Sequence, residues 1–333
     1  MSVGGRIRLA RKAAGLNQRE LAAMCNLSAM AISKYERDLM MPQSSALISI
    51  SKALQVSIEF LLKSSRVELT APAYRCKTSL RVKSRASVLA KAQANIERYF
   101  EVEELLGIEP QFAMPDCRSI IAQSYEDIER VADALREEWG LGVGPIENLM
   151  EVLEAKGIKI APVDADSAFD ALMVETHSRI PVIVVRSDLP GDRQRFSLAH
   201  ELGHVVARHV EALDSEKAAN RFAGALLVPA VSARAELGTV RNRLDIKELC
   251  PLKRRYGLSI SAWAYRAKDL GVISESYFAA FNRFLRARGL HREEEWCPME
   301  PESTSRRLRL VSRAVAEGLV SRTKAEELLD VAL

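Results

Sequence analysis

A pair of histidines four residues apart constrains this chain more than any other feature of its sequence. His200 and His204 belong to the segment QRFSLAHELGHVVARH, residues 194–209, whose apolar side chains recur at helical spacing. We therefore expect one helix over 194–209, and positions i and i+4 of a helix lie on the same face. The two imidazoles can then reach one metal ion, and zinc is suited to two imidazoles, one oxygen ligand and one open position. The alternative is a pair of surface histidines that bind nothing.

Glu201 follows the first histidine and completes the pattern His-Glu-x-x-His. A carboxylate beside a metal can accept a proton from water and return it to a leaving amine, so Glu201 is the predicted catalytic base. The pattern is short and recurs by chance, but here it falls mid-helix among apolar residues. His209 lies five residues after His204, about 140° further round the helix. We expect His209 to point away from the site, as a structural residue or a substrate contact.

A third ligand must come from outside this helix. On the next predicted helix, 215–227, Glu216 and Asn220 are four residues apart and share a face. A carboxylate can bind the metal while an amide one turn later orients a histidine. Glu211 and Asp214, on the connecting segment, are the alternative carboxylates.

The first fifth of the chain is basic. Residues 1–66 hold ten lysines and arginines against four acidic residues, whereas the net charge of the whole chain is only +4. A compact basic unit at one end predicts a polyanionic partner for that end. The alternative is a surface that only increases solubility.

The same basic segment has the pattern of a small helical bundle. Asn17 and Glu20 form a predicted capping box, and Ser28 is placed to cap the next helix. Two short helices joined by a tight turn are what reading the major groove of DNA requires. The predicted helices cover 6–14, 18–24, 29–37, 45–54 and 57–62.

The segment LNQRELAAMCNLSAMAISKYERDLMMP, residues 16–42, resembles the Xre (lambda-repressor-like) helix-turn-helix family over its whole length. The resemblance implies a double-stranded DNA operator as partner. Ala29 and Met30 cannot make paired hydrogen bonds to bases, so phosphate contacts should supply most of the affinity. The alternative is a helix-turn-helix kept for dimerisation or docking of a partner. The predicted DNA-binding residues are Gln18, which usually contacts a phosphate in this family, with Arg19, Ser28, Ala29, Met30, Ser33 and Lys34.

The rest of the chain predicts a mixed unit followed by helices. Three strand-like stretches lie before the histidine helix, which is an α+β organisation. A strand or linker is expected over 67–83, helices over 84–107, 124–139 and 145–155, strands over 158–163, 169–175 and 180–185, further helices over 243–290, and two more around Gly318 within 306–333.

The strings RFSLAHELGHVVARH and EKAANRFAGALLVP closely resemble the ImmA/IrrE family of metallopeptidases, and the resemblance covers about residues 120–275. It implies a gluzincin-like zinc site, with Glu216 as the third ligand, and cleavage of a protein, usually a helix-turn-helix repressor. Many members carry two acidic residues in the second string, where this chain has Glu216 but Ala218. His177, at the end of a strand, is a candidate to stabilise the oxyanion.

The five cysteines lie tens of residues apart and form no CxxC pair. We expect buried, reduced thiols in a cytoplasmic protein rather than a disulfide framework. No apolar run approaches the roughly 18–20 residues that span a bilayer, and the start of the chain lacks the apolar stretch of a signal peptide.

Taken together, the sequence predicts a multidomain chain: an all-α, five-helix, lambda-repressor-like domain, an α+β gluzincin-like metallopeptidase domain and a helical C-terminal region. The predicted function is a DNA-binding transcriptional regulator with a zinc endopeptidase that cleaves a repressor or partner such as a toxin, in a stress, mobile-element or toxin–antitoxin circuit; a homodimer is also open. The alternative is a non-enzymatic repressor or antitoxin whose peptidase-like domain binds a partner or ligand. The predicted boundaries are 1–66, 67–115, 116–240 and 241–333.

Overall fold

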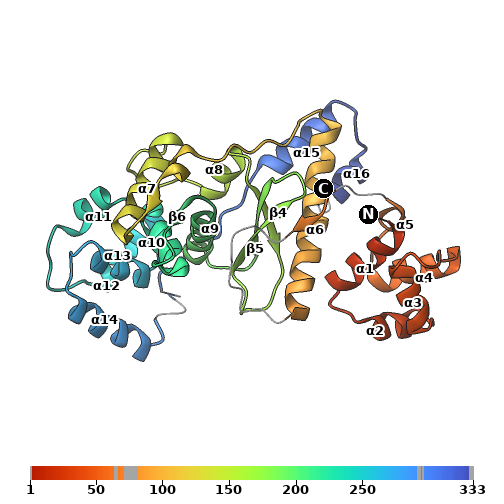
Figure 1. Ribbon diagram of the computed structural model, residues 1–333, viewed down its shortest axis with the longest axis horizontal. Helices are drawn as coiled ribbons and strands as arrows, with labels where there is room; N and C mark the ends of the chain where they lie inside the picture. Colours follow the sequence, from red (N-terminus) through yellow and green to blue (C-terminus); the bar gives the residue numbers. More distant parts are fainter. Residues whose placement is uncertain (1, 64–66, 71–81, 291–293, 295, 330–333) are drawn as a thin grey trace.

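The computed structural model describes residues 2–63, 67–70, 82–290, 294 and 296–329. Five short helices form a bundle at one end of the molecule (Figure 1), around a core that includes Ile7, Leu21, Ile32 and Ile50. The predicted caps are confirmed: Asn17 and Glu20 form a capping box, and the Ser28 hydroxyl accepts from the backbone of Ala31. The helices are α1 (Val3–Ala13), α2 (Gln18–Met24), α3 (Ala29–Glu36), α4 (Ser44–Leu54) and α5 (Ile58–Leu62).

A four-stranded sheet lies at the centre of the molecule, in the order β1-β4-β5-β3. The three predicted strands are present within two residues of their expected bounds: β3 (Lys159–Val163), β4 (Ala171–Thr176) and β5 (Pro181–Arg186). β3 runs parallel to β5, and β4 runs antiparallel to it. Of the predicted segment 67–83, the structure gives the short edge strand β1 (Leu69–Thr70), which pairs with β4; residues 71–81 lie outside the described residues.

Alternate strand residues pack against different helices, because successive side chains of a strand point to opposite faces. The long helix α6 (Val82–Leu105) covers one face, and α9 (Gly191–Val206) covers the other (Figure 1). The histidine helix is therefore held against the sheet. Leu172, Val174, Val182 and Val184 share a core with α6, whereas Met173, Ile183 and Val185 share one with α9.

The predicted helix over 194–209 is wrong at its end. The chain leaves the helix at Ala207, whose backbone is extended, and Arg208–His209 form β6. β6 pairs in parallel with β2 (Ile121–Ala122), an interaction between distant segments that local helical periodicity does not reveal. The predicted helix over 145–155 also begins later than expected, at Leu149, because Asn148 caps it.

The remaining helices surround α9. A single hydrophobic core runs from Cys117 to Leu285 and includes Leu202 of α9, Phe222 of α10 and Trp263 of α13. This core contains residues on both sides of position 240, the predicted boundary between the peptidase domain and the C-terminal region. The elements are η1 (Asp116–Ser119), α7 (Tyr125–Glu138), α8 (Leu149–Ala155), α10 (Ser215–Leu227), α11 (Ala230–Leu237), α12 (Ile246–Tyr256), α13 (Ile260–Asp269) and α14 (Glu275–Ala287).

The last two helices return to the middle of the molecule. α15 (Arg306–Ala316) and α16 (Arg322–Leu329) share a core with Tyr99 and Val102 of α6. The N-terminal bundle also contacts α6, because the buried Arg6 pairs with Glu97 of that helix. Within the bundle, Nε of Arg6 donates to the Lys63 carbonyl over 2.9 Å. One helix therefore contacts the bundle, the sheet and the C-terminal helices.

The expectation of reduced cysteines is wrong for two of the five. Cys250 and Cys297 form a disulfide with a Cα–Cα distance of 6.1 Å. The segment 296–305, before α15, contacts α12 through this disulfide and α9 through hydrogen bonds from Gly191 to Met299 and from Glu302 to Gln194. Sequence spacing does not reveal such a return. Cys25 and Cys117 are free and buried, as expected, and Cys76 lies outside the described residues. Among the helices described, each is too short or too polar to cross a bilayer.

Candidate functional site

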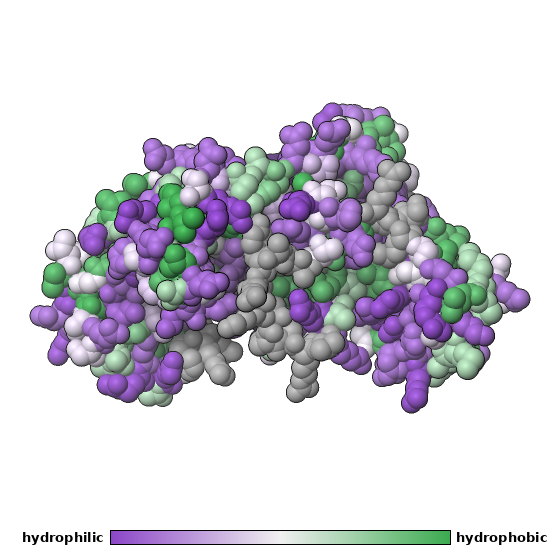
Figure 2. All heavy atoms as spheres, viewed as in Figure 1, coloured by the Kyte–Doolittle hydropathy of each residue, from purple (hydrophilic) through white to green (hydrophobic). Residues whose placement is uncertain are grey.

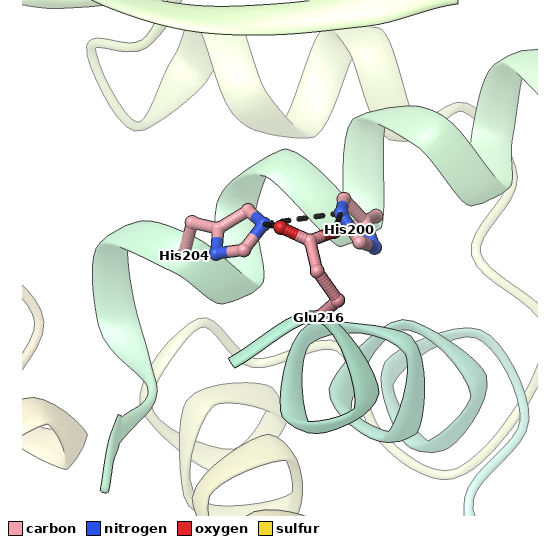
Figure 3. A group of neighbouring side chains, drawn as sticks. All are labelled: His200, His204 and Glu216. Carbon is pink, nitrogen blue, oxygen red and sulfur yellow. Dashed lines mark hydrogen bonds and ion pairs between the residues drawn. The ribbon is translucent and has the colours of Figure 1, made fainter. Parts of the chain in front are cut away.

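Helices α9 and α10 bring the two histidines and one carboxylate together (Figure 3). The Nε2 atoms of His200 and His204 are 3.1 Å apart. The carboxylate oxygens of Glu216 lie 3.4 Å from Nε2 of His200 and 3.6 Å from Nε2 of His204. Within the described part of the chain, these three residues are the group whose donor atoms converge closely enough to bind one metal ion.

This donor set fits zinc. With metal–nitrogen and metal–oxygen bonds of about 2.0–2.1 Å, the ligand atoms of a tetrahedral site are separated by about 3.3 Å. The three separations in this cluster, 3.1, 3.4 and 3.6 Å, lie around that value. Two imidazoles and a carboxylate also leave the fourth position open, as catalytic zinc sites do.

The close approach of α10 to α9 depends on Gly203, which lies between the histidines on the neighbouring face. A Cβ atom at this position would lie 3.0 Å from Cδ1 of Phe222 and 3.3 Å from Cα of Ala219, both on α10. The missing side chain therefore lets the two helix backbones approach, and this places Glu216 within reach of the imidazoles.

Asn220 fixes the tautomer of one histidine. Its side-chain oxygen lies 2.9 Å from Nδ1 of His200. An oxygen can only accept, so Nδ1 carries the hydrogen and the lone pair is left on Nε2, which faces Glu216. Asn220 thus occupies the orienting position predicted from its spacing to Glu216.

His204 is held neutral. Burial, together with the neighbouring His200 and His209, lowers the pKa of His204 from 6.5 to about 4. A neutral imidazole keeps a lone pair available at neutral pH, as metal binding requires. His204 is the more deeply buried of the two, while Glu216 is partly exposed and leaves the cluster accessible.

Glu201 points from α9 to the sheet. Its Oε2 accepts a hydrogen bond of 2.8 Å from the backbone N–H of Met173, on β4, and the side chain is buried. The backbone amide fixes the carboxylate between the helix and the strand, one residue from His200. This contact could not be predicted from the residue types, because every residue of a strand except proline carries the same backbone N–H.

The other candidates have different surroundings. Asp214 accepts from the backbone N–H of Lys217 and caps α10, and Glu211 is exposed in the turn before it. His177 is exposed after β4, and its backbone N–H donates to Glu68. His209 does not belong to the metal cluster, but the helical position predicted for it is wrong, because the helix ends at Val206. His209 lines a cavity together with His204.

The predicted DNA-contacting residues lie on α2, α3 and the turn between them. Met30 is 69% exposed, and Arg19, Ser28 and Lys34 are exposed, whereas Ala29 and Ser33 are half-buried. Gln18 donates from Nε2 to Glu36 over 2.8 Å. Figure 2 shows hydrophobic side chains interspersed with hydrophilic ones over this end of the molecule. The exposed apolar residues of the bundle are Met24, Met30, Leu39, Met40, Met41, Ile48, Ile58 and Leu62.

Comparison with known proteins divides the chain in two. Residues 7–61 match the helix-turn-helix family, and residues 153–268 match the family described as IrrE N-terminal-like domain. The chain is thus a helix-turn-helix protein with a second, α/β-containing domain. It joins an Xre-type helix-turn-helix domain to an ImmA/IrrE-like domain.

Two known proteins are similar to the N-terminal part of this chain. The HTH-type transcriptional regulator ImmR of Bacillus subtilis (strain 168) is 37% identical over 67 residues, which is 20% of this chain and 53% of that protein. The match spans about half the length of this curated relative. A crystal structure of the P22 c2 repressor protein with a synthetic operator is 41% identical, over 19% of this chain and 96% of that one, with a TM-score of 0.19.

Proposed function

We propose that this chain is a DNA-binding transcriptional regulator whose second domain is a gluzincin-like, zinc-dependent endopeptidase. The convergence of His200, His204 and Glu216, with Asn220 behind His200, carries the proposal. These three residues would hold the zinc ion. When bound, zinc supplies Lewis acidity toward a peptide carbonyl and lowers the pKa of water.

Glu201 is the proposed catalytic base. Its carboxylate takes the proton of the attacking water and passes it to the nitrogen of the departing amine, so that one residue serves both halves of the hydrolysis. The hydrogen bond from the Met173 amide supports this role, because it holds Oε2 in place. A carboxylate that is held in position before the substrate arrives is prepared to accept a proton.

DNA binding is proposed for residues 1–66, through Gln18, Arg19, Ser28, Ala29, Met30, Ser33 and Lys34. The exposed cations Arg19 and Lys34 can contact phosphates, and the exposed thioether of Met30 can contact a thymine methyl group but cannot form hydrogen-bond pairs with bases. The partly matched relative is named as a transcriptional regulator, which favours the same role here. Such a protein acts in the cytoplasm, where DNA is accessible.

The proposed substrate is a repressor or another partner protein in a stress, mobile-element or toxin–antitoxin circuit. A peptidase joined to a DNA-binding domain is brought to the proteins that share its operator. We retain 67–115 as the connection, 116–240 as the peptidase domain and 241–333 as a helical C-terminal region. Its helices up to α14 pack into the core of the peptidase domain, whereas α15 and α16 pack against α6.

The test compares the wild type with Glu201→Gln, each loaded with zinc and assayed for metal content. Both are incubated with helix-turn-helix repressors encoded by neighbouring genes. Equal zinc content with cleavage by the wild type alone is the expected result. Equal cleavage by both would remove Glu201 as the base, and bound zinc without any cleavage would favour the non-enzymatic alternative.

DNA binding is tested separately by mobility shift on DNA from the upstream region. Arg19→Ala should weaken binding and reduce the slope of log affinity against log salt by about 1, because one phosphate contact is lost. Lys52→Ala, which removes a cation from α4 rather than from the helix-turn-helix, is the matched control. An unchanged slope in Arg19→Ala would exclude Arg19 from the DNA contact.

A further inference from the structure

A cavity of about 220 Å³ opens beside His204, at the C-terminal end of α9. Its wall includes three basic residues, Arg118, Arg208 and His209, and also Ser215. None of the residues that line it in the described part of the chain is acidic. Because His204 is both a candidate zinc ligand and part of this wall, whatever occupies the cavity lies directly beside the metal cluster.

The basic wall is assembled by tertiary structure. Arg118, on η1, donates from Nε to the carbonyl of Val205 over 2.9 Å, which holds its guanidinium at the end of α9. The parallel pairing of Ile121 with Arg208 and of Ala122 with His209 brings β6 beside the segment that follows Arg118. Two arginines that are 90 residues apart in the sequence therefore line one small space.

Two carboxylates at the start of α10 have partners of their own. Glu216 directs its oxygens to the Nε2 atoms of the two histidines, and Asp214 caps the first turn of α10. The lining also includes the small residues Gly203, Ala218 and Ala219, which leave room without adding charge. The cavity therefore combines positive charge with a volume below the roughly 300 Å³ of small-molecule pockets, a size suited to a single side chain.

We infer that this cavity receives an acidic side chain, aspartate or glutamate, of the polypeptide substrate, next to the peptide bond that is cut. The inference rests on the proposed peptidase function and specifies its substrate class. A guanidinium matches a carboxylate in shape and charge, and such hydrogen bonds are roughly twice as strong as neutral ones. Because Arg208 is exposed, salt should weaken this attraction.

The test uses binding rather than turnover. The probes are peptide hydroxamates, whose hydroxamate group binds zinc, and they are prepared as pairs that differ only in glutamate or glutamine beside that group. One pair extends to each side of the hydroxamate, so both chain directions are covered. Affinities are measured by calorimetry with the zinc-loaded full chain, as wild type, Arg208→Gln and Arg179→Gln. Arg179 is an exposed residue of the β4–β5 turn and serves as control.

In one of the pairs, glutamate should bind the wild type and Arg179→Gln at least about ten-fold more tightly than glutamine. In Arg208→Gln this preference should fall below about three-fold, and it should weaken in all proteins as salt is raised. Arg208 is exposed and its replacement should leave the fold intact, whereas Arg118 also supports α9 and is a less suitable target. Equal binding of glutamate and glutamine in both pairs would overturn the inference alone. Zinc-loaded protein that binds no hydroxamate would overturn the proposed function and the inference with it.

Discussion

The side-chain oxygen of Asn220 lies 2.9 Å from Nδ1 of His200, so a residue on α10 determines which nitrogen of a histidine on α9 is available to a metal. Replacing Asn220 by alanine should weaken zinc affinity by about 10–100-fold, because the ring loses its orientation and its fixed tautomer. Competition with a chromogenic chelator measures this. Lys217→Ala, on an exposed face of the same helix, should keep wild-type affinity, and an unaffected Asn220→Ala would exclude the orienting role.

The sequence offers three candidate carboxylates for the third metal ligand, Glu211, Asp214 and Glu216. Of these three, the structure places Glu216 beside the histidines. Glu216→Ala should lose bound zinc after gel filtration, whereas Glu211→Ala should retain it, since only Glu216 converges with the histidines. Asp214→Ala should also keep the metal but lower the free energy of unfolding by about 1 kcal/mol through loss of the α10 cap. Metal content by mass spectrometry, combined with urea unfolding, distinguishes the three variants. Retention of zinc by Glu216→Ala would contradict the assignment.

The Cys250–Cys297 disulfide should stabilise the fold. It closes a loop between positions 47 residues apart, and a loop of this length contributes on the order of 2–4 kcal/mol to the free energy of unfolding. Cys297→Ser should therefore lower that free energy by a similar amount, and the difference from wild type should vanish when the wild type is unfolded in a strong reductant. Wild-type stability of Cys297→Ser under oxidising conditions would be evidence against the bond.

Cys117 should be chemically inert in the folded protein. Burial, with Glu138 and Asp116 nearby, raises the pKa of its thiol to about 12, so the reactive thiolate is scarce at neutral pH. Alkylation by iodoacetamide at pH 7.5, followed by mass spectrometry, should be slow in native protein and fast in urea. Rapid native labelling would show that the thiol is accessible and ionised.

Glu151 should make part of the stability depend on pH. Hydrogen bonds from the Ser305 side chain and backbone, at the start of α15, lower the pKa of Glu151 in the folded state. Glu151 therefore stabilises the fold at pH values above its unfolded-state pKa, near 4.3. This stabilisation is lost as the pH falls through the lower pKa of the folded state. The difference in unfolding free energy between wild type and Glu151→Gln should shrink toward pH 3. Because the side chain is partly solvent-screened, we expect a small effect, and a difference that grows on acidification would contradict it.

Local patterns predicted the elements that position the metal cluster. The 3.6-residue repeat of the α-helix is enough to place His200 with His204 on one helix face, and Glu216 with Asn220 on another. The second of these helices, α10, covers 215–227 as predicted. The caps at Asn17 and Ser28 are equally local.

Features that need distant segments could not be predicted in this way. The end of α9 depends on the pairing of β6 with β2, and for that reason the position of His209 was missed. The disulfide depends on the return of residues 296–305, and the Met173 contact of Glu201 depends on a backbone group. The arginines of the cavity converge only after folding.

The ion pair between Arg6 and Glu97 limits how the chain can be divided. A fragment that stops at residue 66 keeps every helix of the bundle but loses α6, and with it the carboxylate that pairs with Arg6 in the full chain. The shortest autonomous piece of the N-terminal half should accordingly extend beyond Glu101, which also pairs with Lys63. The predicted end of the bundle, at residue 66, and Glu101, which pairs with Lys63, are therefore about 35 residues apart in the sequence.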